Sequence, residues 1–361
     1  MKKVTLIIII ISNLILADDN FSADLRFGYQ KNDNKQESAL RLNLNTKTDN
    51  YYGFSINATL SSVIGYGDKN QGALPFFDSN GQDYTNMSKL YIKYEISNTQ
   101  IIVGRQAIES PFADIDGGAM IENSFEAFTI INKDIKDTTI TLSQVQKWAG
   151  VDAPNTNVFT DINGDKGMQI IGISYEGIKN MTFNAWFYNL DSVSKNYYTD
   201  INYENENNTI SYGGALQYAL QKYDNGDMAK IFGIESHIGI KSIGLEFGLA
   251  YNYVDGINAD NLFGGGPFFT NEQQNALIGR HSNGNIMLYS VSFDASILGA
   301  KGLNLYMSRD KHDNKHLTSE NDYVIEYEYN DKINFSLIYS DVTNNPASSF
   351  RNIRAFVDYR F

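Results

Sequence analysis

Apolar and polar residues alternate with a period of two along most of the chain. In residues 21–30 the odd positions are apolar or small and the even positions are polar or glycine. This periodicity is typical of a β-strand with one apolar face and one polar face. The alternation predicts an all-β fold, and the same pattern returns at 52–60, 210–220, 243–253, 323–329, 333–339 and 353–361.

Alternation alone fits both a soluble β-sandwich and a transmembrane β-barrel, but three further features favour the barrel. Tyr residues gather near the ends of the alternating segments, where a lipid-facing strand meets the headgroups. The chain also stops at Phe361, an outward position of the last segment. In outer-membrane barrels such a residue resembles the signal that the assembly machinery reads.

The connections between the predicted strands alternate in length, as they do in barrels with short periplasmic turns and longer extracellular loops. We predict an antiparallel transmembrane β-barrel of eighteen strands, and sixteen strands fit nearly as well. The long connections, near 64–83, 108–123, 149–167 and 255–283, all follow odd-numbered predicted strands, whereas 48–50, 98–99, 241–242 and 331–332 are short.

The first residues predict export. Two lysines precede the apolar stretch 4–16, and Ala17 stands before the polar Asp18. This order predicts a cleaved signal peptide over 1–17, because about 13 apolar residues are fewer than the roughly 20 that span a bilayer. Residues 18–361 are then predicted to form one barrel domain in the bacterial outer membrane, with a constriction loop near 108–123.

Composition removes several other classes of function. The chain has 42 Asp and Glu against 29 Lys and Arg, which gives a formal net charge of -13. Such an acidic chain repels phosphate, so nucleic acid is not expected as a partner. Since the chain has no Cys, disulfides, thiolate metal sites and Cys nucleophiles are excluded.

The long connection near 108–123 is the candidate pore constriction. A barrel of sixteen to eighteen strands leaves an aqueous lumen that a loop must narrow. The alternative is an ordinary exposed acidic loop. Four carboxylates would give the constriction a negative face: Glu109, Asp114, Asp116 and Glu122.

A basic wall is the second candidate feature. If apolar faces meet lipid, then the polar faces of the first, second and last strands turn inward, and those strands are neighbours in a closed barrel. The predicted pore-lining arginines are Arg26, Arg41, Arg354 and Arg360. Opposite charges across an aperture would sort permeating solutes by charge. Equally, these arginines could pair with Asp24, Asp358, Glu326 and Glu328 and only stabilise the wall.

One segment carries a family resemblance. The run Val103-Gly104-Arg105-Gln106, followed by Pro111, Asp116 and then Asn123-Ser124-Phe125-Glu126-Ala127, resembles OprD-type porins, in which a Gly-Arg/Lys-Gln strand leads into the constriction loop. The Campylobacter-type major outer membrane porins are similar in outline. The resemblance implies an eighteen-stranded diffusion channel and admits a homotrimer. The Asp-x-Arg of that family is Asp116-Gly117-Gly118 here, so the family's carboxylate specificity is not implied.

A metal site and a catalytic site are the remaining candidates. Asp161, Asn163 and Asp165 place oxygen donors at alternate positions, which suggests a structural Ca²⁺ in this loop, but the distal Glu of an EF-hand is absent. The alternative is an Asn/Gly/Asp-rich turn. No Ser or Asp can be placed beside the inward-facing His237, so we predict no enzymatic activity and no required cofactor.

Together these features predict a porin. The channel would pass ions and small hydrophilic solutes by passive diffusion, with a modest preference for cations that follows from the acidic loop and the net charge. Expected partners are these solutes, outer-membrane lipid and lipopolysaccharide, and the barrel-assembly machinery at Phe361. The alternative is an adhesin or receptor barrel that binds a ligand through its extracellular loops.

Overall fold

The computed structural model describes residues 20–33, 35–69, 74–274, 284–313, 318–344 and 349–361. The predicted signal peptide at 1–17 lies outside these residues. No helix in the described part of the chain is long and apolar enough to span a membrane.

The described chain consists of β-strands and loops, with two short 3₁₀ turns, η1 (Lys241–Ile243) and η3 (Ala295–Leu298). The strands are β1 (Phe21–Asn32), β2 (Lys35–Lys47), β3 (Phe54–Lys69), β4 (Tyr84–Ile96), β5 (Thr99–Gln106), β6 (Ser124–Asn132), β7 (Thr138–Ala149), β8 (Thr160–Asp161), β9 (Met168–Ile178), β10 (Met181–Leu190), β11 (Ser194–Glu206), β12 (Ile210–Tyr223), β13 (Met228–Ile240), β14 (Leu245–Gly256), β15 (Gly284–Asp294), β16 (Leu303–Asp313), β17 (Thr318–Asn330), β18 (Ile333–Asn344) and β19 (Phe350–Arg360).

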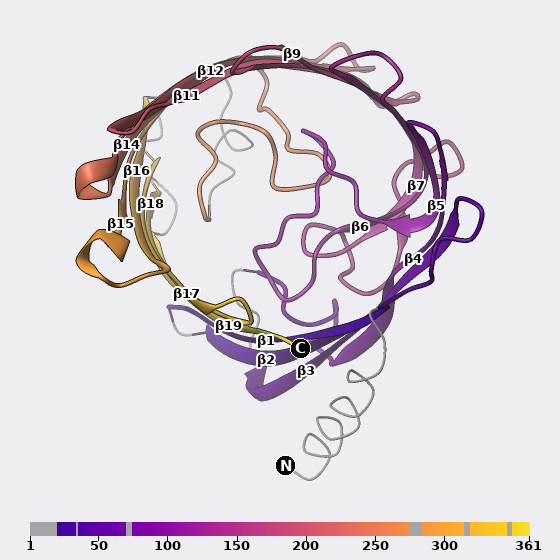
Figure 1. The fold of residues 1–361 in the computed structure, drawn as a ribbon, viewed down its shortest axis with the longest axis horizontal. Helices are drawn as coiled ribbons and strands as arrows, with labels where there is room; N and C mark the ends of the chain where they lie inside the picture. The colour runs from indigo at the N-terminus through magenta and orange to yellow at the C-terminus, as the bar shows by residue number, and fades with distance from the viewer. Residues whose placement is uncertain (1–19, 34, 70–73, 275–283, 314–317, 345–348) are drawn as a thin grey trace.

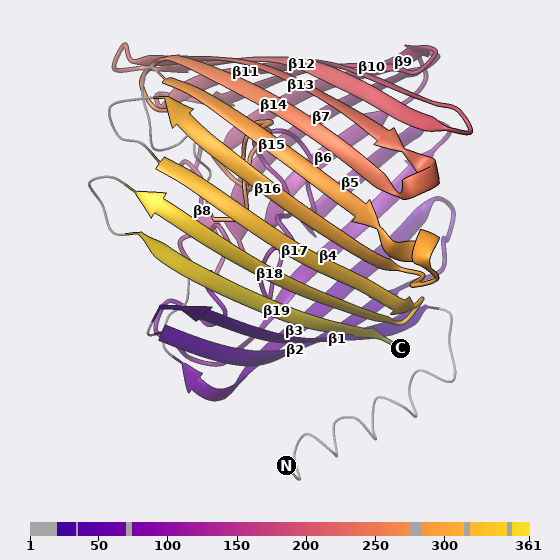
Figure 2. The same cartoon turned by 90° about the vertical axis from the view of Figure 1, so that its left-hand side faces the viewer.

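The sheet closes on itself. Each strand pairs antiparallel with its neighbours in sequence, and β1 pairs with β19, so the ring is complete (Figure 1). The exception is β8, which pairs only with the end of β7, while β7 and β9 pair directly. Leaving β8 aside, eighteen described strands form the barrel, which confirms the predicted number over sixteen. The strands are strongly tilted to the barrel axis (Figure 2).

Side-chain alternation assigns the two faces of the wall. On β1, Phe27 is exposed on the outside, whereas Gly28 and Gln30 are buried on the inside. Outward positions of the other strands carry exposed apolar side chains such as Ile92, Leu216 and Phe247. An outer face of exposed apolar side chains is what a barrel surrounded by lipid presents.

Two long connections fold into the barrel. Residues 107–123 follow β5 and residues 257–274 follow β14, and both lie inside the ring in the view down the axis (Figure 1). They pack against inward residues of β6–β15 in a buried apolar core that includes Phe112, Trp148 and Phe268. A second core joins Met120 and Ile121 to the opposite wall.

Candidate functional site

The loop that follows β5 is anchored by the motif that the sequence singles out. Gly104 has a φ of 124°, and a Cβ there would lie 2.3 Å from the carbonyl oxygen of Leu90, so only glycine fits. Arg105 pairs with Glu126 at 2.9 Å, and buried Gln106 donates from Nε2 to the Ala127 carbonyl at 2.9 Å. The motif therefore fixes where the chain leaves β5 and enters the lumen.

From this anchor, residues 107–123 run from one side of the barrel to the other. At one end, fully buried Phe112 packs edge-on against Tyr188 of β10 and Tyr198 of β11, with ring centroids 5.4 and 5.9 Å apart. The Tyr188 hydroxyl accepts a hydrogen bond from the Phe112 backbone N–H at 3.2 Å.

The other end of the loop meets two arginines of the wall. Arg26 donates from Nη1 to the carbonyls of Gly117 at 3.1 Å and Ala119 at 2.6 Å, and Arg41 donates to the Met120 carbonyl at 2.9 Å. Since β1–β2 and β10–β11 lie on different sides of the ring, the loop crosses the lumen (Figure 1). The arginines contact its backbone rather than its carboxylates.

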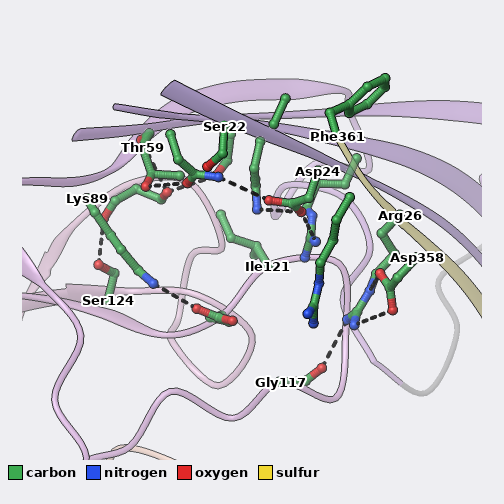
Figure 3. A pocket seen from close by; sticks show the side chains of 18 residues that line it. Ser22, Asp24, Arg26, Thr59, Lys89, Gly117, Ile121, Ser124, Asp358 and Phe361 are labelled. Atoms are coloured by element: carbon green, nitrogen blue, oxygen red, sulfur yellow. Dashed lines mark hydrogen bonds and ion pairs between the residues drawn. The ribbon is translucent and has the colours of Figure 1, made fainter. Parts of the chain in front are cut away.

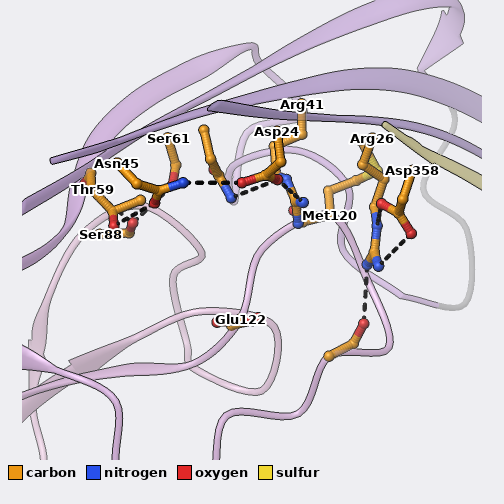
Figure 4. Close-up of polar contacts among 12 residues, drawn as sticks. Asp24, Arg26, Arg41, Asn45, Thr59, Ser61, Ser88, Met120, Glu122 and Asp358 are labelled. Atoms are coloured by element: carbon orange, nitrogen blue, oxygen red, sulfur yellow. Dashed lines mark hydrogen bonds and ion pairs between the residues drawn. The ribbon is translucent and has the colours of Figure 1, made fainter. Parts of the chain in front are cut away.

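The four predicted wall arginines all lie on inward positions, but they differ in whether a carboxylate neutralises their charge. Arg26 binds Asp358 through two hydrogen bonds of 2.7 and 3.0 Å, and Arg41 binds Asp24 at 2.5 Å (Figure 4). These two contacts follow the pairing alternative, in which wall carboxylates neutralise the arginines. Buried Arg354 instead donates to the side-chain and backbone oxygens of Gln273 at 2.6 and 3.1 Å.

Arg360 is the exception among these arginines. It is exposed and makes no side-chain hydrogen bond or ion pair with any residue that the structure describes. Arg360 stands opposite Asp24 in the β1–β19 register. It also lines a cavity together with Glu326 and Glu328. Arg360 is therefore a basic group that remains available to a solute.

A cavity of about 470 Å³ lies between these wall strands and the loop. Its polar lining brings together Asp24, Arg26, Lys89 and Ser124 beside the tip of the loop at Gly117 (Figure 3). Lys89 points across it to Glu122 at 3.0 Å. The cavity is lined mainly by polar side chains and carries both signs of charge, as an aqueous passage requires.

The four acidic residues of the loop do not lie together. Glu122 is paired with Lys89, and Glu109 lies at the other end of the loop, exposed and beside a different cavity. Asp114 and Asp116 lie close together in the middle of the loop, where Asp116 accepts from the Gly118 N–H at 2.9 Å. The structure thus separates the four predicted carboxylates into three places.

A third aspartate joins this middle pair, and the sequence did not single it out. Asn123 donates from Nδ2 to the Asp152 carboxylate at 2.7 Å and to the Asp114 carbonyl at 3.1 Å. Although Asp152 as a residue is exposed, desolvation of its carboxyl raises its pKa to about 7, and the charge of Asp116 adds to the shift. The charge in the middle of the loop therefore changes near neutral pH.

Asp114 also binds the second loop. Its carboxylate accepts the backbone N–H groups of Gly265 at 3.2 Å and Gly266 at 3.3 Å. Burial raises the pKa of Asp114 and outweighs these hydrogen bonds, which act in the opposite direction. Backbone bonds between Asp114 and Phe263 and between Phe263 and Phe112 complete the contact, so the two loops form one unit inside the lumen.

The wall of β11–β17 carries further carboxylates that face inward. Glu204 lies 3.1 Å from His237 Nε2, and Glu246 lies close to the inward Gly239. The positions between them along each strand, such as Ile234 and Phe247, are exposed on the outside. The inward carboxylates of this wall include Asp200, Glu204, Glu235, Glu246, Asp310, Glu320, Asp322, Glu326 and Glu328. Most were not singled out, although alternation places each of them inside.

The predicted Ca²⁺ loop shows other contacts. Asp161 lies 3.7 Å from Lys147, and Asn163 donates to the Asp191 carbonyl at 3.0 Å. Within the described ranges, no group of three or more His, Asp or Glu side chains is placed to hold a metal ion. Ca²⁺ binding at Asp161, Asn163 and Asp165 stays a prediction.

Comparisons with known proteins agree on one architecture. A family model described as outer membrane porin, OprD family, matches residues 16–338. Pseudomonas aeruginosa OccK8 (OprE) superposes with a TM-score of 0.81 at 16% identity, covering 95% of this chain and 98% of that chain. A comparison with curated proteins gives no match.

Two further solved structures show the same fold. A BenF-like porin from Pseudomonas fluorescens Pf-5 has a TM-score of 0.82 at 15% identity, covering 96% of this chain and 99% of that chain. Acinetobacter baumannii OccAB3 has a TM-score of 0.83 at 12% identity, covering 96% of this chain and 99% of that chain.

Proposed function

The chain belongs to the OprD family of porins of the bacterial outer membrane, and from this premise we propose that its lumen passes ions and small hydrophilic solutes with a modest preference for cations. Passage is passive, since diffusion through a polar lumen requires no coupled reaction. The family is one of channels, and we propose no catalytic role for the His237 and Glu204 pair.

The cation preference rests on how the charges of the lumen are compensated. Arg26 and Arg41, which would otherwise attract anions, are neutralised by Asp358 and Asp24. Carboxylates of the facing wall, such as Glu246 and Glu328, have no ion pair among the described residues. Arg360 is an uncompensated basic group, but the unpaired inward carboxylates of β11–β17 outnumber it. The remaining field in the lumen is therefore negative on balance, and a negative field raises the local concentration of cations.

The two long loops support a channel over the alternative of an adhesin or receptor. That alternative requires long loops that project away from the barrel toward a ligand. Residues 107–123 and 257–274 instead pack against the inner wall and against each other. This packing supports the proposal that both loops narrow the passage.

A liposome-swelling assay tests the proposed passage. We expect proteoliposomes that contain the refolded protein to swell in ribose, more slowly in glucose and slowest in sucrose, because the loops narrow the lumen. Empty liposomes are the control. Folded protein that permits no swelling in any of these sugars would contradict the proposal and favour a receptor.

We also propose two partners of the folded barrel. The Phe361 backbone N–H donates to the Ala23 carbonyl at 2.9 Å, and its ring packs edge-on against Tyr359 with centroids 4.7 Å apart. We propose that the assembly machinery reads this residue, and that lipopolysaccharide contacts the outer face. The homotrimer that the resemblance admits stays a prediction.

A further inference from the structure

A third cavity differs in character from the two that the wall arginines line. It measures about 260 Å³ and lies against β5, β6, β7, β9 and β10, next to the point where residues 107–110 leave the wall. Its lining includes the large apolar side chains of Ile102, Ile131, Ile170 and Trp186. A concave, mainly apolar surface with a few polar groups is the usual form of a small-molecule site.

This cavity faces the lumen and not the lipid. The residues that alternate with its lining, Val103, Phe128, Leu142 and Ile171, are between 42% and 48% exposed on the outer face. Neighbouring residues of a strand point to opposite faces, so the lining residues point inward. Apolar side chains at inward positions are unexpected in a water-filled barrel, whose interior is normally polar.

The wall is shaped to seat the indole of Trp186. Gly172 of β9 lies directly beside it, and a Cβ at Gly172 would come within 2.3 Å of Trp186 Cζ3. The indole also stacks on Tyr188, with centroids 6.3 Å apart and an interplanar angle of 21°. The ring is therefore held in place against the wall, and Trp presents the aromatic face that attracts cations most strongly.

One carboxylate in the lining is uncompensated. Glu109 is exposed, and it makes no ion pair or side-chain hydrogen bond within the described part of the chain. The lining contains no Lys, Arg or His. Its only formal charge is thus negative, next to an aromatic ring and several isoleucines.

We infer that this cavity is a binding subsite for small organic ammonium ions that carry an aromatic or alkyl group. The ammonium would pair with Glu109 and contact the aromatic face of Trp186, and the apolar group would contact the isoleucines. The volume suffices, because about 150 Å³ accommodates a benzene ring. This inference rests on the proposed channel function, since the ligand would reach the cavity through the lumen.

Isothermal titration of the folded, full-length protein with phenethylammonium tests the subsite without relying on conduction. We expect saturable binding that ethylammonium and phenylpropionate do not reproduce, since the first lacks the ring and the second has the wrong charge. We expect Glu109→Gln and Trp186→Leu each to weaken binding roughly tenfold, as the loss of an ion pair or a cation–π contact predicts. Asp134→Asn, in a short turn, is the charge-matched control.

Absence of saturable binding, or equal affinity in the wild type and both variants, would overturn the subsite. Circular dichroism of each variant shows whether it is folded, and Glu109, being exposed, can be replaced with little risk to folding. Conductance in KCl is measured separately. Open KCl steps without phenethylammonium binding would refute only the subsite, whereas binding by a barrel that never conducts would refute only the channel.

Discussion

At the scale of single residues, alternation predicts where a side chain points but not which distant residue it meets. It places Arg26 and Arg41 on inward positions because each belongs to a regular strand, and in the structure both side chains lie on the inner face. Asp152 lies in a loop, 29 positions from Asn123, to which its carboxylate binds. No periodicity relates two loops, so this member of the acidic group could not be found from the sequence.

The raised pKa of Asp152 predicts a pH-dependent cation preference. Below about pH 7 this carboxyl is protonated and neutral, and above that pH it is an anion beside Asp116. The preference for K⁺ over Cl⁻ should therefore increase as pH rises from 6 to 8, with its midpoint near 7. Reversal potentials recorded across this range check the sign, and Asp152→Asn should flatten the curve. A preference that falls with rising pH would contradict this assignment.

A second pH effect is expected at Glu272. It concerns how firmly residues 257–274 bind to the inner wall of the barrel. Burial and the contact with Asp322 raise the pKa of Glu272 to about 10, and its carboxyl accepts from the Ser308 hydroxyl at 3.0 Å. An acid whose pKa is raised in the docked state favours docking most at low pH. That contribution is lost progressively as pH rises above the ordinary pKa of the free carboxyl.

Hydrogen exchange at residues 271–274 measures this effect. After correction for the intrinsic rate, protection should be lower at pH 9 than at pH 6, whereas Glu272→Gln, which mimics the protonated acid, should reduce the difference. Equal protection of the wild type at both pH values would show that Glu272 does not control docking.

At the scale of elements, strands were predictable and loop packing was not. Period-two alternation and alternating loop lengths were sufficient to predict eighteen strands, because each lipid-facing strand must be apolar on one side. The two-residue β8 carries no alternation and was missed. The bridge between Ala113 and Phe263 joins loops about 150 positions apart, and nothing in either loop encodes the other.

Phe112 is expected to hold the loop across the lumen. Its ring is fully buried among Tyr188, Tyr198 and Phe268, and replacing a buried Phe by Ala removes about 3–5 kcal/mol of packing. Phe112→Ala should therefore release residues 107–123 and increase the single-channel conductance and its noise. Phe112→Leu, which keeps most of the apolar volume, should stay close to the wild type. Unchanged conductance in a folded Phe112→Ala barrel would mean that this loop does not narrow the passage.

At the scale of the whole molecule, net charge indicates the sign of the lumen field but not its distribution. The formal charge of -13 agrees with a cation preference, yet the predicted separation of an acidic loop from a basic wall is only part of the arrangement. The wall arginines that face the loop are largely compensated, and many of the inward carboxylates lie on β11–β17. This follows from barrel closure, which brings the polar faces of distant strands around one lumen.

Neutralising inward carboxylates of β17 should therefore weaken the preference for K⁺ over Cl⁻. We expect the double variant Glu326→Gln, Glu328→Gln to lower the ratio of K⁺ to Cl⁻ permeability roughly twofold, with little change in stability because both residues line an open cavity. The effect should fade at high salt, where screening shortens the reach of these charges. Asp134→Asn removes a charge outside the lumen and should leave the ratio unchanged. Equal ratios in the double variant and the wild type would remove this wall from the explanation of selectivity.

The most direct test of a cation-preferring open lumen is the reversal potential of single channels under a KCl gradient. The refolded protein is inserted in a planar bilayer at pH 8, where the carboxyl of Asp152 is ionised. We predict stable open steps with a reversal potential of the sign that K⁺ permeation gives, reduced in the double variant Asp114→Asn, Asp116→Asn. Folded barrels that stay silent, or a reversal potential of the sign that Cl⁻ permeation gives, would contradict the account.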